Sequence, residues 1–183
     1  MSNLRRLRTR YFFAVEGEGE QSFVKYLQQI SDQRGLSVHL GCHILNGGGY
    51  QSMLEKAIKI RRREAQKRGR IHKSVLLVDA DRKEFRDDSW NHMRLRQEAQ
   101  KNAFLLCLQT PNQEGVLLRM HKGHEAKSYN AAKVKEKILK QWPSYKKPIN
   151  AAQLSSRFTI DDLERSAKYD AELAALLKII GVC

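Results

Sequence analysis

The sequence predicts an α/β fold built on a mostly parallel sheet of about four strands, flanked by helices. Its strand candidates are uniformly apolar rather than alternating, which is typical of strands covered on both faces. Helical patterns separate these candidates along the chain, as in parallel β-α units. At 183 residues, 41% of them apolar and 30% charged, the chain is long enough for one domain with its own core.

The first half of the chain alternates strands with helices. Residues 11–15 (YFFAV) are expected to form a buried strand, and apolar residues then recur at the i, i+3, i+4, i+7 spacing of a helix from Phe23 onward. A second strand is expected within 36–45, where the turn residues NGGG end it. A second helix with a basic outer face follows within 51–68.

Two more strands precede a largely helical remainder. Residues 74–81 (SVLLVDAD) are apolar until their acidic end, and residues 103–109 (AFLLCLQ) form the fourth strand candidate. A long helix is expected over 159–181, because Thr159 with an acidic first turn is a typical N-cap and Gly181 a typical C-terminal stop.

Composition bounds the class of protein. We expect one compact unit, with an α/β core over 1–125 and a helical extension over 126–183 packed on it. No apolar run approaches the roughly 18 residues of a membrane span, and the start lacks a signal-peptide pattern, so a cytoplasmic protein without membrane association is expected. The three cysteines have neither C-x-x-C spacing nor His/Cys pairing, which favours neither a disulfide framework nor a zinc site.

The charge of the chain favours a polyanionic partner. The formal net charge is +14, and the excess is clustered in LRRLRTR at the start and in KIRRREAQKRGRIHK at 59–73. Such clusters attract phosphates, so a nucleic acid is the expected partner, and a merely solvated helix face is the alternative for any one run. The expected contacts are Arg61, Arg62, Arg63, Arg68, Arg70, Lys73, Arg82 and Lys147.

Acidic residues close two of the predicted strands. Glu16 follows the first strand, and Asp79 and Asp81 end the third. In a parallel open sheet, functional groups gather beyond the carboxyl ends of the strands, and alternate residues of an extended segment point the same way. The three carboxylates are therefore expected to converge and to hold Mg²⁺, because hard oxygen ligands suit that ion. An acidic turn without a ligand is the alternative.

This constellation resembles the TOPRIM domain of topoisomerases, primases and OLD-type nucleases, which has a glutamate after the first strand (here VEGEGE) and D-x-D after a later one (here VDAD). With TPNQEGVLLRMH and WPSYKK, it is similar to the RloB-like branch over roughly residues 11–150. The resemblance implies that Glu16 is the TOPRIM glutamate, and that Glu114 and His121 match the branch's later acid-then-histidine motif. Gly19 stands where the branch often has threonine.

The resemblance implies a Mg²⁺-dependent nuclease acting on DNA or RNA, tRNA included, with Mn²⁺ as a substitute ion and a role in bacterial phage defence. Glu16, Asp79, Asp81 and Glu114 are then the catalytic candidates, and Glu18, Glu20 and His121 are accessory ones. A separately encoded ATPase is an implied partner, and homo-oligomerisation is left open.

Three alternatives remain at this point. A non-catalytic nucleic-acid-binding module on the same scaffold would show no metal-dependent turnover. A haloacid-type phosphatase also uses D-x-D, but on its first strand, whereas here the pair follows the third and precedes RKEF. Glu18 and Glu20 also suit the first turn of any helix, and His121 suits a structural position beside an apolar face.

Overall fold

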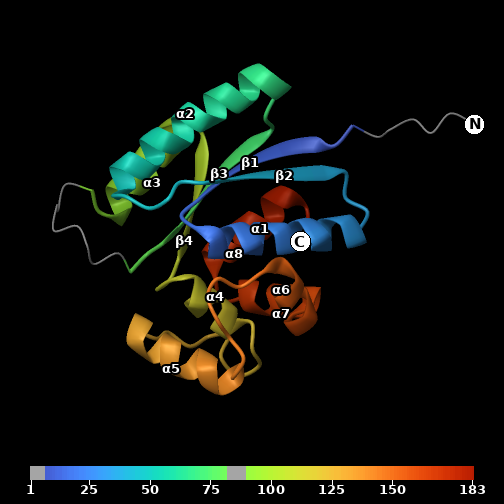
Figure 1. Ribbon diagram of the computed structural model, residues 1–183, viewed down its shortest axis with the longest axis vertical. Coiled ribbons are helices and arrows are strands. Elements are labelled where there is room, and N and C mark those ends of the chain that lie inside the picture. Colours follow the sequence, from blue (N-terminus) through green and yellow to red (C-terminus); the bar gives the residue numbers. More distant parts are fainter. Residues whose placement is uncertain (1–6, 82–89) are drawn as a thin grey trace, which may run out of the picture.

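The computed structural model describes residues 7–81 and 90–183. The strands within these ranges form one parallel sheet, with the neighbours in the order β2-β1-β3-β4 (Figure 1). This confirms the predicted α/β class with a four-stranded parallel sheet. The strands are β1 (Thr9–Val15), β2 (Val38–Ile44), β3 (Lys73–Asp79) and β4 (Phe104–Gln109).

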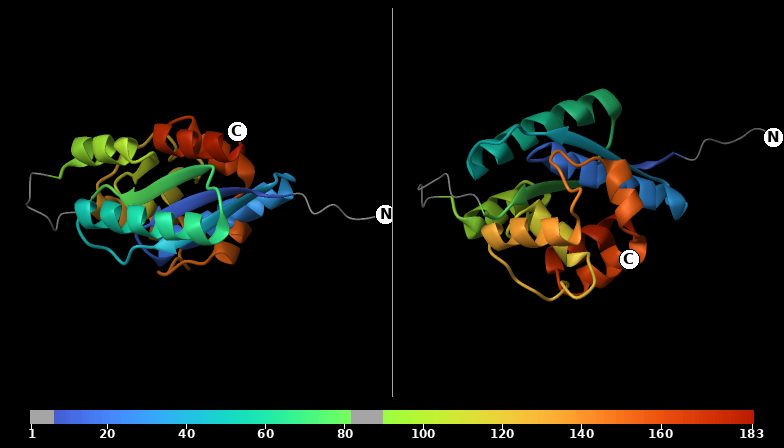
Figure 2. Two further views of the ribbon diagram at one scale, coloured as in Figure 1. Left: turned by 90° about the horizontal axis from the view of Figure 1, so that it is seen from above. Right: turned by 60° about the horizontal axis from the view of Figure 1, so that its bottom comes forward.

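Helices cover both faces of this sheet, as Figures 1 and 2 show. One face carries α2 (Tyr50–Arg68) and α3 (His92–Lys101), and the other carries α1 (Glu18–Gln33) and α8 (Ala171–Ile180). The remaining described helices lie beyond the α1 side: α4 (Gln113–Arg119), α5 (Ala131–Gln141), α6 (Ala151–Arg157) and α7 (Ile160–Ala167). No helix in the described part of the chain is long and apolar enough to cross a membrane.

The strand register brings the carboxyl ends of the strands to one edge of the sheet. Val15 at the end of β1 lies opposite Ile44 of β2 and Leu77 of β3. Asp79 at the end of β3 lies opposite Gln109 at the end of β4. Residues that directly follow β1 and β3 therefore meet at this carboxyl edge, as the sequence predicted.

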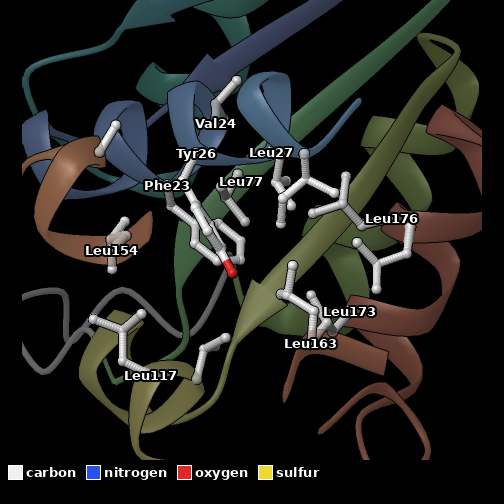
Figure 3. Close-up of a cluster of buried hydrophobic side chains, with 14 of the residues drawn as sticks. Phe23, Val24, Tyr26, Leu27, Leu77, Leu117, Leu154, Leu163, Leu173 and Leu176 are labelled. Carbon is white, nitrogen blue, oxygen red and sulfur yellow. The ribbon is translucent and has the colours of Figure 1, made fainter. Parts of the chain in front are cut away.

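Two hydrophobic cores, one on each face, hold the sheet between its helices. The α1-side core joins α1, α8 and the sheet with helices α4 to α7, so residues on both sides of position 125 share it. Figure 3 shows Phe23, Tyr26 and Leu27 of α1 beside Leu77 of β3, with Leu176 of α8 near them. The α2-side core joins α2 and α3 with the opposite sheet face. Side chains buried on both faces explain why the strands read as uniformly apolar.

The long helix predicted over 159–181 is two helices, α7 and α8, and that prediction was wrong about its middle. Asp170 interrupts it, because its carboxylate accepts hydrogen bonds from the N–H groups of Glu172 and Leu173 and so caps α8. The same carboxylate pairs with Arg119 at 2.6 Å, where both side chains are largely buried. The cap and the ion pair at Asp170 together break the helix, although the apolar periodicity of the sequence continues through this position. Both predicted ends, Thr159 and Gly181, are confirmed.

We expect Ala103→Gly to raise the free energy of unfolding by about 0.5–1 kcal/mol. Ala103 follows the C-cap of α3 with φ +55°, a left-handed conformation in which a Cβ atom is unfavourable and glycine is not. Urea unfolding measures the change. Ala65→Gly in the exposed interior of α2 is the control, and it should lower stability by about 1 kcal/mol. A loss of stability in both variants would contradict the strain at Ala103.

Candidate active site

Backbone pairing between β1 and β3 places the first two acids. Glu16 directly follows β1, and its N–H donates to the Leu77 carbonyl at 3.2 Å. The N–H of Asp79 in turn donates to Oε2 of Glu16 at 3.3 Å. The Glu16 carboxylate is thus held against the last residue of the neighbouring strand, as the sequence predicted from the two strand ends.

The turn from β1 to α1 separates its other two glutamates. Glu20 is only 6% exposed, and its Oε2 accepts a hydrogen bond from the Gly17 N–H at 2.9 Å, which caps the start of α1. Burial raises the pKa of Glu20, and the charge of Glu16 raises it further. Glu18 is exposed in the same first turn. Of the two accessory glutamates, Glu20 therefore faces the other acids and Glu18 faces solvent.

Asp79 is the electrostatic centre of the site. Burial raises the pKa of its carboxyl group to about 8, and the charges of Glu20, Glu16 and Asp81 add to this effect. A hydrogen bond from the Gln113 N–H to Oδ1 of Asp79, 2.8 Å long, opposes the rise. Three carboxyl groups thus act on the carboxyl group of Asp79 at the carboxyl edge. We call these four residues the acid cluster: Glu16, Glu20, Asp79 and Asp81.

The start of α4 holds the D-x-D segment from the other side. Oδ2 of Asp81 accepts a hydrogen bond from the Asn112 amide at 2.9 Å. Asn112 is also the N-cap of α4, where its Oδ1 accepts from the Gly115 N–H. Between the two aspartates, the Ala80 N–H donates to the carbonyls of Gln109 and Pro111. Asn112 was not among the predicted site residues, although an asparagine before a short helix is a recognisable N-cap signal.

The loop between α5 and α6 brings a lysine to the acids. Lys147 Nζ lies 2.5 Å from Oε1 of Glu114, the predicted later glutamate. Burial opposes the charge of Lys147, but Glu114, Asp79 and Glu20 outweigh it, so the pKa of Lys147 is raised. Tyr145 of the same loop is buried, and burial followed by the charge of Glu114 raises the pKa of its hydroxyl group. Lys147 is therefore a cation held within the field of the acid cluster.

Gly19 leaves room for a buried amide. A Cβ atom at Gly19 would lie 2.1 Å from Oε1 of Gln113, which is 2% exposed. A larger residue such as threonine does not fit at position 19, because the Gln113 side chain occupies that space. The Gln113 Nε2 and both amide atoms of Gln109 are buried and make no hydrogen bond to any described residue. Buried polar atoms of this kind normally bind water or a ligand.

Two further side chains, not predicted from the sequence, support the end of β3. The Tyr50 hydroxyl group donates to the Asp79 carbonyl at 3.0 Å. His92 Nε2 lies 3.1 Å from that hydroxyl oxygen and 3.0 Å from the Ala80 carbonyl. Tyr50 begins α2 and His92 begins α3, and no pattern in the sequence indicates that these two helix starts meet.

The structure does not bring His121 into the acid cluster. Its ring packs edge-on against Phe158, with the ring centroids 4.9 Å apart. Burial, together with nearby cations such as Arg157, lowers the pKa of His121 to about 4, so the ring is neutral near pH 7. This position matches the structural alternative for His121 rather than the accessory one.

The basic run expected to bind nucleic acid lies at the edge of the sheet opposite the acid cluster. It occupies the last turns of α2 and the start of β3. Lys73 and Asp79, the first and last residues of β3, are about 20 Å apart at 3.3 Å per residue. A nucleic acid that contacts both must span the sheet. Arg82 lies outside the described residues, Arg61 is half-buried, and the exposed members are Arg62, Arg63, Arg68, Arg70 and Lys73.

The donor set of the acid cluster suits a hard divalent cation. Among residues 7–81 and 90–183, no three His, Cys, Asp or Glu side chains are grouped so that they could hold a metal ion. Mg²⁺ rarely needs such a cage, because one or two carboxylates, waters and substrate phosphates commonly complete its shell. One or two carboxylates of the acid cluster would be enough for an open site of that kind, and the acidic charges that act on Asp79 favour uptake of a cation.

Comparison of this chain with models of protein families, with curated proteins and with solved structures gives no match.

We expect Asp79→Asn to stabilise the metal-free protein increasingly as pH rises. The folded protein keeps a proton on Asp79 up to a pH of about 8, whereas the unfolded chain loses it near pH 3.8. The folded state binds more protons between these values, so its stability falls as pH rises through that window. Urea unfolding in EDTA at pH 5 and 8.5 measures the free energy of unfolding. The excess of Asp79→Asn over the unsubstituted protein should grow by about 1 kcal/mol per pH unit.

Glu18→Gln is the matched control for this measurement, because Glu18 is an exposed acid at the same turn. Its effect on stability should be small and nearly independent of pH. An equal gain for Asp79→Asn at both pH values would contradict the raised pKa of Asp79.

We expect Gly19→Ala to destabilise the protein by about 1–3 kcal/mol, because the new Cβ atom must displace the buried Gln113 side chain. Adding Gln113→Ala should restore part of the loss, since it empties the contested space. Thermal unfolding of both single variants and the double variant measures the coupling. Gly41→Ala is the control, because its Cβ would meet nothing closer than the Tyr11 carbonyl oxygen at 3.4 Å. If the stability losses of Gly19→Ala and Gln113→Ala simply added in the double variant, the predicted contact between position 19 and the Gln113 side chain would be contradicted.

Proposed function

We propose that this protein is a Mg²⁺-dependent nuclease that hydrolyses the phosphodiester bonds of DNA or RNA. One observation carries the proposal: the charges of Glu16, Glu20 and Asp81 all act on the half-buried Asp79, at the edge where β1 and β3 end side by side. Carboxylates whose charges act on one another are costly to keep together in a folded protein. Binding of a divalent cation would offset the repulsion among these carboxylates.

Each acid has its own part in this proposal. Glu16, Asp79 and Asp81 hold the ion, while Glu20 stays bonded to the Gly17 N–H and fixes the turn that carries Glu16. Bound Mg²⁺ supplies a Lewis acid for a phosphoryl oxygen and lowers the pKa of a bound water. The Gln113 N–H holds the Asp79 carboxylate in one orientation through its bond to Oδ1.

Lys147 provides the positive charge that a phosphate substrate needs. Its side chain is 58% exposed, yet its Nζ is anchored by Glu114 and lies in the field of Asp79 and Glu20. An ammonium group in this place can bind a phosphate oxygen while the acids hold the metal. Glu114 then acts on the substrate through Lys147 rather than as a metal ligand.

The resemblance to the RloB-like branch of TOPRIM proteins supports the same assignment. Its motifs require the glutamate after the first strand and the D-x-D pair to be neighbours, and here they follow the adjacent strands β1 and β3. The proposal extends by that resemblance to phage defence beside a separately encoded ATPase. The net charge of +14 favours a nucleic-acid substrate of either sugar type.

We expect the purified protein to cleave nucleic acid with Mg²⁺ or Mn²⁺ and not with EDTA. Glu16→Gln and Asp79→Asn should reduce the rate by orders of magnitude, because each removes a metal-binding charge and little volume. Glu20→Gln should cost about 10- to 100-fold, as changes beside metal ligands typically do. The assay uses duplex DNA, single-stranded DNA and total tRNA.

Glu18→Gln is the control with the same change of charge at the same turn, and it should leave the rate nearly unchanged because Glu18 is exposed. Full activity of Asp79→Asn would refute the metal site. Binding of nucleic acid without metal-dependent cleavage, unaffected by Glu16→Gln, would instead identify a non-catalytic binding module.

A further inference from the structure

A second site lies at the amino edge of the sheet, away from the acid cluster. A pocket of about 670 Å³ opens there between the end of α2, the start of β3, the turn from α3 to β4, and α8. Its lining includes Lys73, the first residue of β3. Lys73 and Asp79 are separated by the length of β3, about 20 Å. A small ligand bound in this pocket therefore does not touch the acid cluster.

The rim of the pocket is cationic and lacks acids. Arg62 and Lys73 line it with exposed side chains, and neither makes a hydrogen bond or an ion pair with any residue of 7–81 or 90–183. Arg61 forms one wall, where its guanidinium lies 4.6 Å from the centre of the Phe104 ring and donates to the Asn102 carbonyl at 2.6 Å. No aspartate or glutamate is among the lining residues. The charge of this rim is complementary to a phosphate.

Apolar residues also line the pocket, and we call them its apolar floor: half-buried Ile71, Leu105 and Ile179 with the exposed alanines Ala65 and Ala103. His72, Ser74 and Gln100 add polar groups to the lining. A simple inorganic anion gains nothing from such a floor, because it is strongly hydrated. A ligand that joins a phosphate to a flat, weakly hydrated ring gains from both parts, since apolar side chains and guanidinium planes accept nucleobases face to face.

Electrostatic repulsion between the cations of the rim also favours binding of an anion. Burial lowers the pKa of Arg61, and the adjacent charge of Arg62 lowers it further. Two neighbouring guanidinium groups without an acid between them repel each other, and a bound anion relieves that repulsion. The volume lies within the range of ordinary small-molecule sites, about 300–1,000 Å³.

We propose that this pocket binds a nucleoside phosphate, with the phosphate on Arg62 and Lys73 and the base on the apolar floor. The nucleotide is either free in solution or the end of a nucleic-acid strand. The proposal goes beyond the nuclease activity and does not depend on it, because the pocket shares no residue with the acid cluster.

The test is calorimetric titration of the full chain with AMP, with inorganic phosphate as the comparison ligand. EDTA is present throughout, so that metal-dependent cleavage plays no part. AMP should bind more tightly than phosphate. Arg62→Ala should weaken AMP binding by about 10-fold or more, because a charge-assisted contact with phosphate is worth at least about 1.4 kcal/mol.

Arg63→Ala is the matched control. Arg63 is the next residue of α2, is exposed and carries the same charge, but it does not line the pocket. Its removal should change AMP binding by less than about twofold, as expected for a screened surface charge. Equal losses in Arg62→Ala and Arg63→Ala would overturn the proposal, since they would indicate general attraction to a basic helix.

A second pair of variants tests the pocket without changing charge. Ala65→Phe places a ring inside the cavity and should abolish AMP binding, whereas Gln66→Phe on the neighbouring exposed position should not. Unchanged AMP binding in Ala65→Phe, or AMP binding no tighter than phosphate, would overturn the proposal. Competition with a 5′-phosphorylated oligonucleotide then separates the sources: displacement of AMP assigns the pocket to a strand end, and no displacement assigns it to the free nucleotide.

Discussion

Mutual repulsion among carboxylates at the carboxyl edge of the sheet is the constraint on which the site depends. Backbone N–H groups hold these acids in spite of it: the Asp79 N–H donates to Glu16, the Gly17 N–H to Glu20, and the Gln113 N–H to Asp79. Because main-chain donors cannot move away without disturbing a strand or a helix, the fold keeps the charges together. The adjacency of β1 and β3 and the position of α4 are therefore requirements of the site.

Among the described residues, Lys147 partly balances this field. Lys147 comes from a loop far along the chain and is tied to Glu114 in α4, the helix whose first N–H group holds Asp79. The C-terminal helices matter to the site for this reason, since they share the α1-side core and fix the loop that carries Lys147. Helices beyond the sheet thus contribute a charge as well as apolar burial.

Much of this arrangement is readable from the sequence, because short-range physics decides it. Uniformly apolar runs predict strands covered on both faces, and an acid at the end of each of two such runs predicts a shared edge. Contacts between segments distant in sequence are not readable in this way. The Gln113 amide that fills the space beside Gly19 leaves no periodic signal, and neither does the Arg119 partner that helps Asp170 interrupt the helix predicted over 159–181.

The location of the basic run in the fold was likewise not predictable from the sequence. Its charge was evident from the sequence, but its place was not: α2 carries it away from the acid cluster, toward the amino edge. The sheet therefore has an acidic end and a cationic end, about 20 Å apart by the length of β3. The chemistry proposed for the first end and the anion binding proposed for the second can therefore be tested separately.

The most direct measurement of the central claim is an NMR titration of the aspartate side-chain carboxyl carbons, with and without Mg²⁺, in which Asp79→Asn assigns the signal. Without metal, Asp79 should titrate at a pKa of about 8, raised by burial and by its acidic neighbours, and Mg²⁺ should lower that value. An Asp79 carboxyl group that titrates near the ordinary aspartate value of about 3.9, unmoved by Mg²⁺, would contradict the account.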